Sequence, residues 1–453
     1  GSEMCIRDRS NALSVTGLAL SAQSASVAGD LSMGLVSPHA VAGQIVLDAP
    51  GSLLGEDVPP IAVVLEISGE ALAPVISARS RTPVQASLEA TLGLRTTPPA
   101  VDAKLAWEGF DWTLPNRQAL TLAPGKLTFG GNLGDYRVAA ETAVQVQDMP
   151  EAAIRLQARG NEQSLALDSL HVQTLDGRLD AKGTLSWGEA LAWQLSLDAM
   201  GINPGRYDPR VEGSLNGRIR SKGTLTESLS MQVAIEQIDG SLLDYPLAAS
   251  GELNIDGDSI IAKDMRLATG DNRFRLDGRI VKPFDVSFEV DAPRLDSVLP
   301  GLSGAVQGEG QLKGAWPSPQ LVSTLVASDI AYTEYRLDNA RVQVDWRTDG
   351  GEARIELEAL QSGDLEVQRV VADLKGSPQR HALNLSLISD KLNAELAASG
   401  ALEGELWRGD LQDLQLSGPA LGTWNQQQPT RLVAGKQQLQ LGSLCLQGSG
   451  GRA

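Results

Sequence analysis

The sequence predicts an all-β protein built as an elongated, curled antiparallel sheet, a groove-like rod with an apolar interior. Three observations favour this class. Apolar and polar residues alternate with a period of two along much of the chain. Gly and Asp-Gly turns separate the alternating segments. The composition includes 47 Gly but only 4% aromatic residues, which suits many short strands and turns better than a bulky compact core.

The alternation defines one apolar face and one polar face of the predicted sheet. In one segment, Val342, Val344 and Trp346 alternate with charged or amide side chains. Successive strand side chains point to opposite faces, so the apolar members of such segments should share one side. A β-bulge reverses the phase and can overturn any single assignment. The candidate groove residues are Trp193, Leu195, Leu197, Val233, Ile235, Phe274, Leu276, Val286, Phe288, Val290, Val342, Val344, Ile355, Leu357, Leu385 and Leu387.

Tight turns are predicted where Asp precedes Gly, because these residues accept the positive φ values of hairpin turns. At about 10 residues per strand and turn, the chain holds roughly 40 strands. An open sheet of that width must close, stack or extend as a rod. Helical periodicity is scarce, and one short turn of helix is expected within residues 293–302. The predicted Asp-Gly turns are Asp176-Gly177, Asp256-Gly257, Asp277-Gly278 and Asp349-Gly350-Gly351.

The chain is acidic, with 38 Lys and Arg against 56 Asp and Glu and a formal net charge of −18. This balance argues against nucleic acid and against docking on anionic lipid headgroups as partners. Two cysteines, Cys5 and Cys445, are too few for a disulfide scaffold or a cysteine zinc site. The longest apolar runs fall far short of the about 20 residues that cross a bilayer.

The two ends of the chain differ from the rest. No signal peptide is visible. Residues 1–10 match no downstream pattern and resemble the translated adapter sequence found at the ends of metagenomic assemblies. We therefore expect them to be non-native and exclude them from the fold prediction. The other end stops in mid-pattern, which indicates a fragment of a longer protein.

Catalytic and metal-binding patterns are absent from the sequence. His39, His171 and His381 lie on separate segments without ligand-spaced neighbours, so they are expected to be surface or strand residues. Asp256-Gly-Asp258 and Gly270-Asp-Asn272 lack the ligand ladder of a calcium loop and are expected to be turns. The carboxylate pairs Glu356/Glu358 and Asp349/Glu352 are expected on the polar face. No nucleophile elbow, phosphate loop or dinucleotide fingerprint occurs, so no enzyme activity, metal or cofactor is predicted.

Several ordered motifs resemble the TamB family, within the wider AsmA-like group. The likeness is clear over residues 171–453 and weaker over 11–170, and it depends on the order and spacing of motifs rich in Gly, Leu and Asp. The motifs include 175–185 (LDGRLDAKGTL), 211–217 (VEGSLNG), 276–280 (LDGRI), 291–296 (DAPRLD), 299–304 (LPGLSG) and 308–314 (GEGQLKG). Residues 416–419 (LSGP), Trp424 and 444–446 (LCL) resemble a further element of the family.

The resemblance implies a periplasmic β-groove anchored in the inner membrane and spanning towards the outer membrane. It implies transport of phospholipid along the groove, a contribution to outer-membrane biogenesis, and a TamA-like barrel protein as partner through regions that this chain lacks. In the family a second cysteine commonly follows the Leu-Cys-Leu element, so the resemblance implies that Cys445 is a half-cystine whose partner is missing.

Three functional interpretations remain open from the residues. In the first, the apolar face cradles acyl chains, which need apolar surface but no directional contacts. In the second, the sheet edge offers its backbone to client strands and assists outer-membrane β-barrel assembly and secretion. The third is a secreted β-solenoid adhesin or polysaccharide-binding passenger, which would want Asn or Thr ladders and aromatic platforms that do not appear. A closed β-sandwich core is the structural alternative for the apolar face.

Overall fold

The computed structural model describes most of the chain. The described residues are 3–9, 11–22, 25–50, 60–82, 84–113, 118–315, 319–363, 365–404, 406–436, 438–448 and 451–452. They form two compact units, Gly1–Glu227 (unit 1) and Ser228–Ala453 (unit 2). This boundary follows from the contacts within each unit. The division of the sequence at 170/171 follows only from where the resemblance to the TamB family becomes clear.

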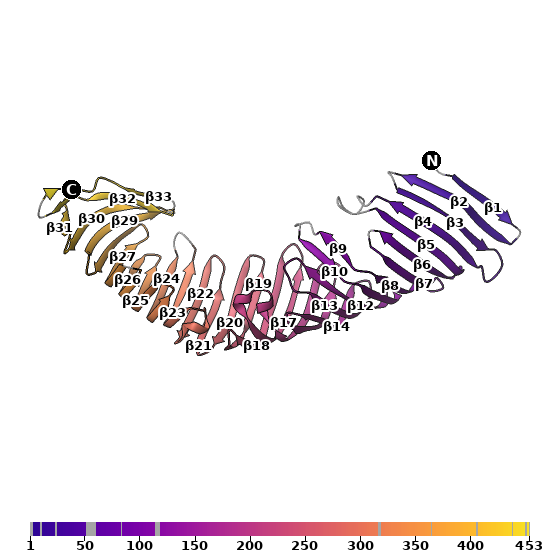
Figure 1. Cartoon of the computed structure of the whole chain (residues 1–453), viewed down its shortest axis with the longest axis horizontal. Coiled ribbons are helices and arrows are strands. Elements are labelled where there is room, and N and C mark those ends of the chain that lie inside the picture. The colour runs from indigo at the N-terminus through magenta and orange to yellow at the C-terminus, as the bar shows by residue number, and fades with distance from the viewer. Residues whose placement is uncertain are drawn as a thin grey trace. The chain divides into compact units, whose positions relative to one another are not determined.

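Unit 1 consists of strands joined by short connections, with two single-turn 3₁₀ helices near its end. Most of its strands lie beside their neighbours in the chain (Figure 1, indigo to magenta). The elements are β1 (Glu3–Arg9), β2 (Ala12–Ala22), β3 (Ala25–Gly34), β4 (Val41–Ala49), β5 (Ile61–Glu70), β6 (Ala73–Thr82), β7 (Ala86–Gly93), β8 (Ala100–Trp107), β9 (Phe110–Thr113), β10 (Ala119–Leu122), β11 (Gly125–Asn132), β12 (Asp135–Val146), β13 (Ala152–Gly160), β14 (Ser164–Thr174), β15 (Gly177–Ser186), β16 (Leu191–Ile202), η2 (Pro204–Arg206), η3 (Pro209–Val211) and β17 (Gly213–Leu225).

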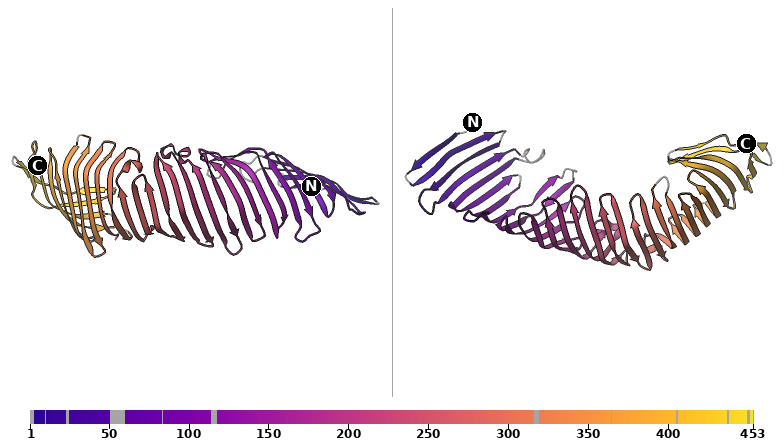
Figure 2. Two further views of the ribbon diagram at one scale, coloured as in Figure 1. Left: turned by 90° about the horizontal axis from the view of Figure 1, so that it is seen from below. Right: turned by 180° about the vertical axis from the view of Figure 1, so that it is seen from behind.

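Unit 2 repeats this design, with long strands up to Gly418 and short strands after it (Figure 2, magenta to yellow). The elements are β18 (Leu229–Leu242), β19 (Tyr245–Asp256), β20 (Ser259–Thr269), β21 (Asn272–Arg279), β22 (Phe284–Ala292), η4 (Leu295–Ser297), β23 (Leu302–Gly314), β24 (Gln320–Tyr332), β25 (Tyr335–Arg347), β26 (Gly350–Ser362), β27 (Leu365–Ser377), β28 (Arg380–Ile388), β29 (Asn393–Glu403), β30 (Leu406–Gly418), β31 (Gly422–Gln426), β32 (Thr430–Gly435), β33 (Gln438–Leu441), β34 (Leu446–Gly448) and β35 (Gly451–Arg452).

Within each unit the strands pair antiparallel, mostly with their neighbours in sequence. In unit 1, β8 also pairs with β11, and β10 pairs with both β9 and β12. In unit 2, β30 pairs with β31 along one half and with β32 along the other. The described strands form a single-layered sheet that does not close into a barrel, and no second sheet of the described residues faces it. The predicted all-β class with an open antiparallel sheet is therefore confirmed, and the closed-sandwich alternative is wrong.

Residues 3–9 of the segment excluded as non-native also lie in the sheet. Strand β1 pairs with β2 in an antiparallel register that aligns Ile6 with Val15. The pairing does not test where these residues come from, so their origin stays a prediction.

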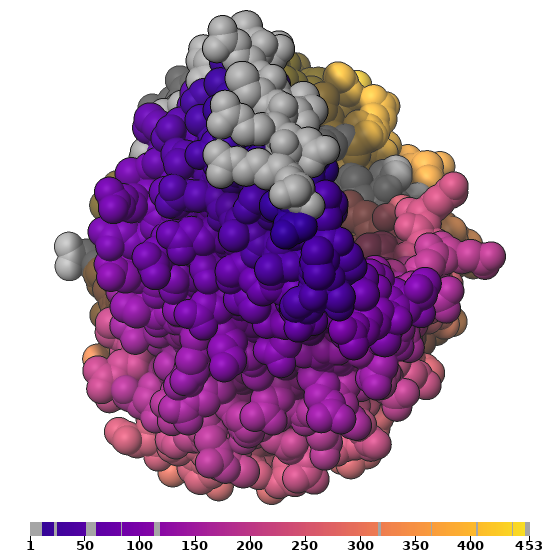
Figure 3. Space-filling model, turned by 90° about the vertical axis from the view of Figure 1, so that its right-hand side faces the viewer, coloured from indigo at the N-terminus to yellow at the C-terminus, as the bar shows by residue number. Residues whose placement is uncertain are grey.

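A single layer leaves few side chains fully enclosed. Among the described residues, eleven hydrophobic side chains are buried, the largest being two leucines, Leu295 and Leu411. The accessible surface is 27828 Å², against roughly 16,000 Å² for a compact protein of this mass. Side chains nevertheless fill the spaces between neighbouring ribbons, as the indigo-to-magenta face of unit 1 shows (Figure 3).

The predicted turns and helical turn are largely confirmed. Turns stand at 175–176, 257–258 and 348–349, and η4 lies within the expected 293–302. The prediction at Asp277-Gly278 is wrong, because both residues lie inside β21. Gly278 has a φ of 110°, and a Cβ there would collide with the carbonyl oxygen of Asp285 on β22. This glycine serves the close approach of two strands rather than a turn.

No helix in the described part of the chain is long and apolar enough to cross a membrane.

Candidate functional site: an apolar sheet face

The pairing registers of unit 1 bring apolar side chains into one continuous line. Residues directly opposite in an antiparallel pair point to the same face. Following these pairs from strand to strand connects fourteen strands without a polar side chain, and all fourteen residues are half-buried. The apolar line of unit 1 is Leu18, Gly29, Ile45, Leu65, Ala78, Leu88, Leu105, Leu127, Ala140, Leu156, Leu170, Ala181, Leu197 and Ile219.

Unit 2 has its own apolar line across thirteen strands. Leu267 and Ile355 remain 40% and 39% exposed, and the other members are half-buried. No second layer of the described structure therefore covers the line at these two residues. The apolar line of unit 2 is Ile238, Ala249, Leu267, Phe274, Val290, Gly308, Leu325, Val342, Ile355, Ala372, Leu385, Leu396 and Leu414.

The opposite face of each sheet is charged and internally paired. In unit 1 the register aligns Lys126, Glu141 and Arg155 on adjacent strands, and the Glu141 carboxylate lies 2.9 Å from Lys126 and 3.1 Å from Arg155. Hydrogen bonds from Lys126 and Arg155 lower the pKa of Glu141 below its usual range. Exposed pairs of this kind add little stability each, but they keep this face wettable and unsuited to acyl chains.

Two hollows also lie mainly on the polar face. One, of about 790 Å³ in unit 2, includes Arg275, Glu289 and Glu309 in its lining. The other, of about 590 Å³ in unit 1, is lined by Glu141 and Arg155 among others. Several of these charges are paired, with Arg275 2.9 Å from Glu289 and Arg155 3.1 Å from Glu141. Because charged side chains line both hollows, the candidate site for an apolar ligand is the open apolar face.

The structure places all sixteen predicted groove residues on the apolar faces. Trp193, Leu195 and Leu197 lie on the same face as the apolar line of unit 1. The thirteen others lie on the same face as the line of unit 2, as Leu276 opposite Phe288 and Leu357 opposite Val370 illustrate. Their role in holding lipid is not tested by this placement and stays a prediction.

Sequence patterning missed many members of this face, chiefly where a bulge breaks the period of two. In β14, Leu167 and Leu170 are three positions apart, yet they face Gly183 and Ala181 on the same side. In β18, Ile235 and Ile238 are related in the same way. The polar pair inserted between the two apolar residues, such as Asp168-Ser169, is the sequence signal that could have found them.

Residues with possible chemistry occupy ordinary structural places. His39 is exposed in a loop and His171 lies on β14 beside Asp180, with 2.5 Å between Nδ1 and Oδ1. Glu356 lies on the polar face, where hydrogen bonding to Arg354 lowers its pKa. The described residues contain no group of three or more His, Cys, Asp or Glu side chains arranged to hold a metal. Cys445 is an exposed free thiol.

Comparison with known proteins agrees with this fold. The family model for the TamB N-terminal domain matches residues 6–452. The translocation and assembly module subunit TamB of Haemophilus influenzae is 23% identical over 305 residues, which cover 65% of this chain. The chain spans only about a quarter of the length of that relative, since the match covers 23% of it. Because the family model matches nearly every residue, the chain belongs to the TamB family.

Proposed function

We propose that this chain conducts phospholipid passively, with the acyl chains lying along its apolar faces. The lipid would move through the periplasm between the inner and outer membranes and so contribute to outer-membrane biogenesis. The Haemophilus influenzae relative is named as a subunit of a translocation and assembly module. A TamA-like barrel protein is the proposed partner of the full-length protein, which an inner-membrane anchor would hold. No catalytic step is required.

The observation that carries this proposal is the unbroken apolar line within each unit. Thirteen steps of about 4.8 Å make the line of unit 1 roughly 60 Å long, about four times the hydrocarbon thickness of one bilayer leaflet. Each buried methylene contributes about 0.8 kcal/mol without a directional contact. An acyl chain that moves from one strand to the next therefore replaces its apolar contacts with equivalent ones. This permits movement without a large energy barrier.

The second candidate is a scaffold for outer-membrane β-barrel assembly. The word "assembly" in the relative's name favours keeping it. Here the active feature would be exposed strand backbone rather than apolar side chains. The two candidates therefore assign function to different atoms of the same sheet.

Site-specific photocrosslinking in a Gram-negative periplasm tests the lipid proposal. Probes at Val344 and Leu357 lie on the apolar face, whereas matched probes at Gln343 and Glu356 lie one residue away on the polar face. We expect phospholipid adducts from the apolar pair and none from the polar pair.

A substitution control strengthens this test. Val342→Asp places a carboxylate on the apolar line, and Gln343→Asp places one on the polar face. Losing contact with about two methylenes should reduce lipid capture at Leu357 about tenfold in the first variant, with no change in the second. If an intact fold captures lipid from neither face, the lipid proposal fails and the assembly scaffold becomes the better explanation.

A further inference from the structure

The two sides of the unit 2 sheet along which the strands end and connect differ from each other. The difference concerns where a lipid headgroup could lie. Because the strands are antiparallel, alternate connections lie at opposite edges. We call the edge formed by the connections β18–β19, β20–β21, β22–β23, β24–β25, β26–β27 and β28–β29 the clip rim. We call the opposite edge, from β19–β20 to β29–β30, the tryptophan rim.

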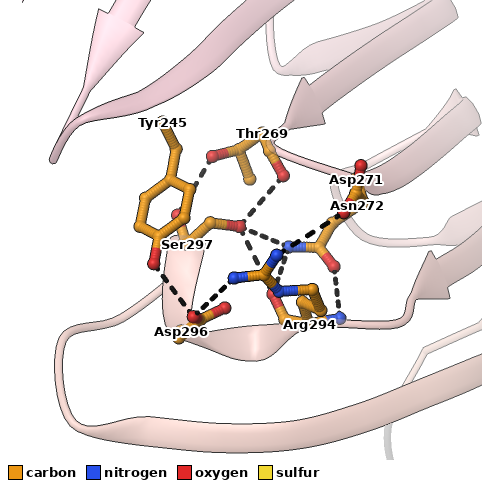
Figure 4. A network of polar contacts seen from close by, with 7 residues as sticks. All are labelled: Tyr245, Thr269, Asp271, Asn272, Arg294, Asp296 and Ser297. Carbon is orange, nitrogen blue, oxygen red and sulfur yellow. Dashed lines mark hydrogen bonds and ion pairs between the residues drawn. The ribbon is translucent and has the colours of Figure 1, made fainter.

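At the clip rim a folded connection covers part of the apolar face. Thr269 and Asn272 face the same side as Leu267 and Phe274, yet they are 6% and 0% exposed because the η4 connection packs over them. The Asn272 amide donates to the Arg294 carbonyl oxygen and to Ser297 Oγ, both at 2.6 Å, and its oxygen accepts from the Arg294 backbone N–H at 3.0 Å (Figure 4).

Further contacts hold this connection in place. Ser297 and Thr269 exchange hydrogen bonds of 3.0 Å through their hydroxyls and carbonyl oxygens. The Tyr245 hydroxyl donates to Asp296 at 2.9 Å, and hydrogen bonding to this hydroxyl and to Arg294 lowers the pKa of Asp296. A headgroup could lie on the apolar face here only by breaking the buried hydrogen bonds of Asn272, Thr269 and Ser297, which is costly.

The tryptophan rim instead carries an aromatic ledge on the apolar face. Trp346, His381 and Trp407 come from three strands, with ring centroids 6.3 Å and 6.2 Å apart. Trp407 Nε1 donates to His381 Nε2 at 2.6 Å, and His381 Nδ1 lies 3.0 Å from the Ser377 carbonyl oxygen. Such rings, apolar over their faces and polar at one edge, favour the boundary between hydrocarbon and headgroups in membranes.

Basic side chains are also more numerous at the tryptophan rim. Counting each connection with three strand residues on either side, the described residues supply eight carboxylates at each rim, but seven basic side chains at the tryptophan rim against four at the clip rim. Arg279, Lys282 and Arg380 are exposed and have no carboxylate partner among the described residues. Long basic side chains can extend beyond an apolar surface and bind phosphate.

We propose that unit 2 orients its lipid cargo, with acyl chains on the apolar face and zwitterionic phospholipid headgroups at the tryptophan rim. This inference rests on the proposed lipid function. The shared chemistry is a phosphodiester beside an apolar tail: the basic residues contact the phosphate, and the Trp346–His381–Trp407 ledge lies under the glycerol region. The paired charges and overall acidity of the chain favour phosphatidylethanolamine over anionic lipids.

Two photoreactive lipids test this orientation on the whole chain. One is a phosphatidylethanolamine with a diazirine joined to its nitrogen by alkylation, which preserves the positive charge, and the other has the diazirine at the end of an acyl chain. Adducts are mapped by peptide mass spectrometry. We expect the headgroup probe to label the tryptophan rim around Thr348 about fivefold more than the clip rim around Thr333, at the other end of β25. The acyl probe should label the apolar face.

Charge variants supply the matched control. Lys282→Glu with Arg380→Glu should reduce headgroup adducts at the tryptophan rim about fivefold, without changing acyl adducts. Arg273→Glu with Arg336→Glu, exposed at the clip rim, should change neither. Excess glycerophosphoethanolamine, which lacks acyl chains, should leave both adducts intact.

The outcomes separate the two proposals. Equal headgroup labelling of both rims, or insensitivity to the first pair of variants, overturns the orientation while acyl labelling keeps the lipid function. Loss of headgroup adducts in glycerophosphoethanolamine also overturns it, because the rim would then bind a free phosphate ester. Absence of acyl adducts contradicts the proposed function itself.

Discussion

At the scale of single residues, Asn272 shows how a polar side chain can shape an apolar face. Its side chain is completely buried and its amide makes three hydrogen bonds to the η4 connection. An unpaired buried donor or acceptor costs more than the hydrogen bond contributes. Asn272 is therefore expected to determine whether the η4 connection stays folded over β20 and β21.

Asn272→Ala should lower the free energy of unfolding of unit 2 by about 2–3 kcal/mol, because it leaves the Arg294 backbone N–H buried without its acceptor. Hydrogen exchange of residues 267–297 in the whole chain measures this loss. The control is Asn339→Ala, an exposed amide 3.4 Å from Glu358, which should change stability by less than about 0.5 kcal/mol. Equal effects of the two substitutions would contradict the role given to Asn272.

At the scale of elements, the glycines inside strands control how closely neighbours approach. Gly278 lies inside β21, one residue before its end and opposite Val286, with a positive φ that residues other than glycine rarely adopt. A methyl group there meets the backbone of β22, which cannot move aside as a flexible side chain could. The pairing of β21 with β22 thus depends on the absence of a side chain.

Gly278→Ala should destabilise the β21–β22 pairing by about 3 kcal/mol, through backbone strain together with a steric collision. Gly363→Ala is the matched control, because Gly363 also has a positive φ, of 57°, but faces open space in the β26–β27 turn. The control should cost only about 1 kcal/mol. Hydrogen exchange in both regions during urea unfolding compares the loss of stability in the two variants. A loss at Gly363 as large as at Gly278 would exclude the steric explanation.

At the scale of the whole molecule, the large exposed surface has a calorimetric consequence. An unfolded chain of 47.9 kDa exposes roughly 69,000 Å², so the folded chain, at 27828 Å², buries about four-fifths of what a compact protein of this mass buries. Both faces of the sheet contribute to this difference within each unit, because no second sheet of the described residues covers either face.

The heat-capacity change of complete unfolding should therefore be about 5 kcal/mol/K rather than the about 6 kcal/mol/K expected for 453 residues in a compact fold. Calorimetry at several pH values gives this quantity as the slope of unfolding enthalpy against melting temperature. A value at or above that of a compact protein would mean that the apolar faces are covered in solution.

The sequence by itself determined the fold class, the two faces and most turns of this protein. Alternation with a period of two assigns a residue such as Val342 or Leu385 to a face through covalent geometry alone. It also predicted the helical turn near Leu295, though not the turns η2 and η3 of unit 1, and the family resemblance. The proposed lipid contacts of these residues remain a prediction.

Only the tertiary structure decided which residues on different strands meet, because register depends on hydrogen-bonded pairs between strands and not on the pattern within one strand. Sequence patterning therefore did not find Leu170 or Ile238, which bulges keep on the apolar face. It assigned Gly278 to a turn, and it could not show that Asn272 is enclosed by a connection about 25 residues away. The local chain fixes which way a side chain points, whereas pairing between strands fixes what it touches.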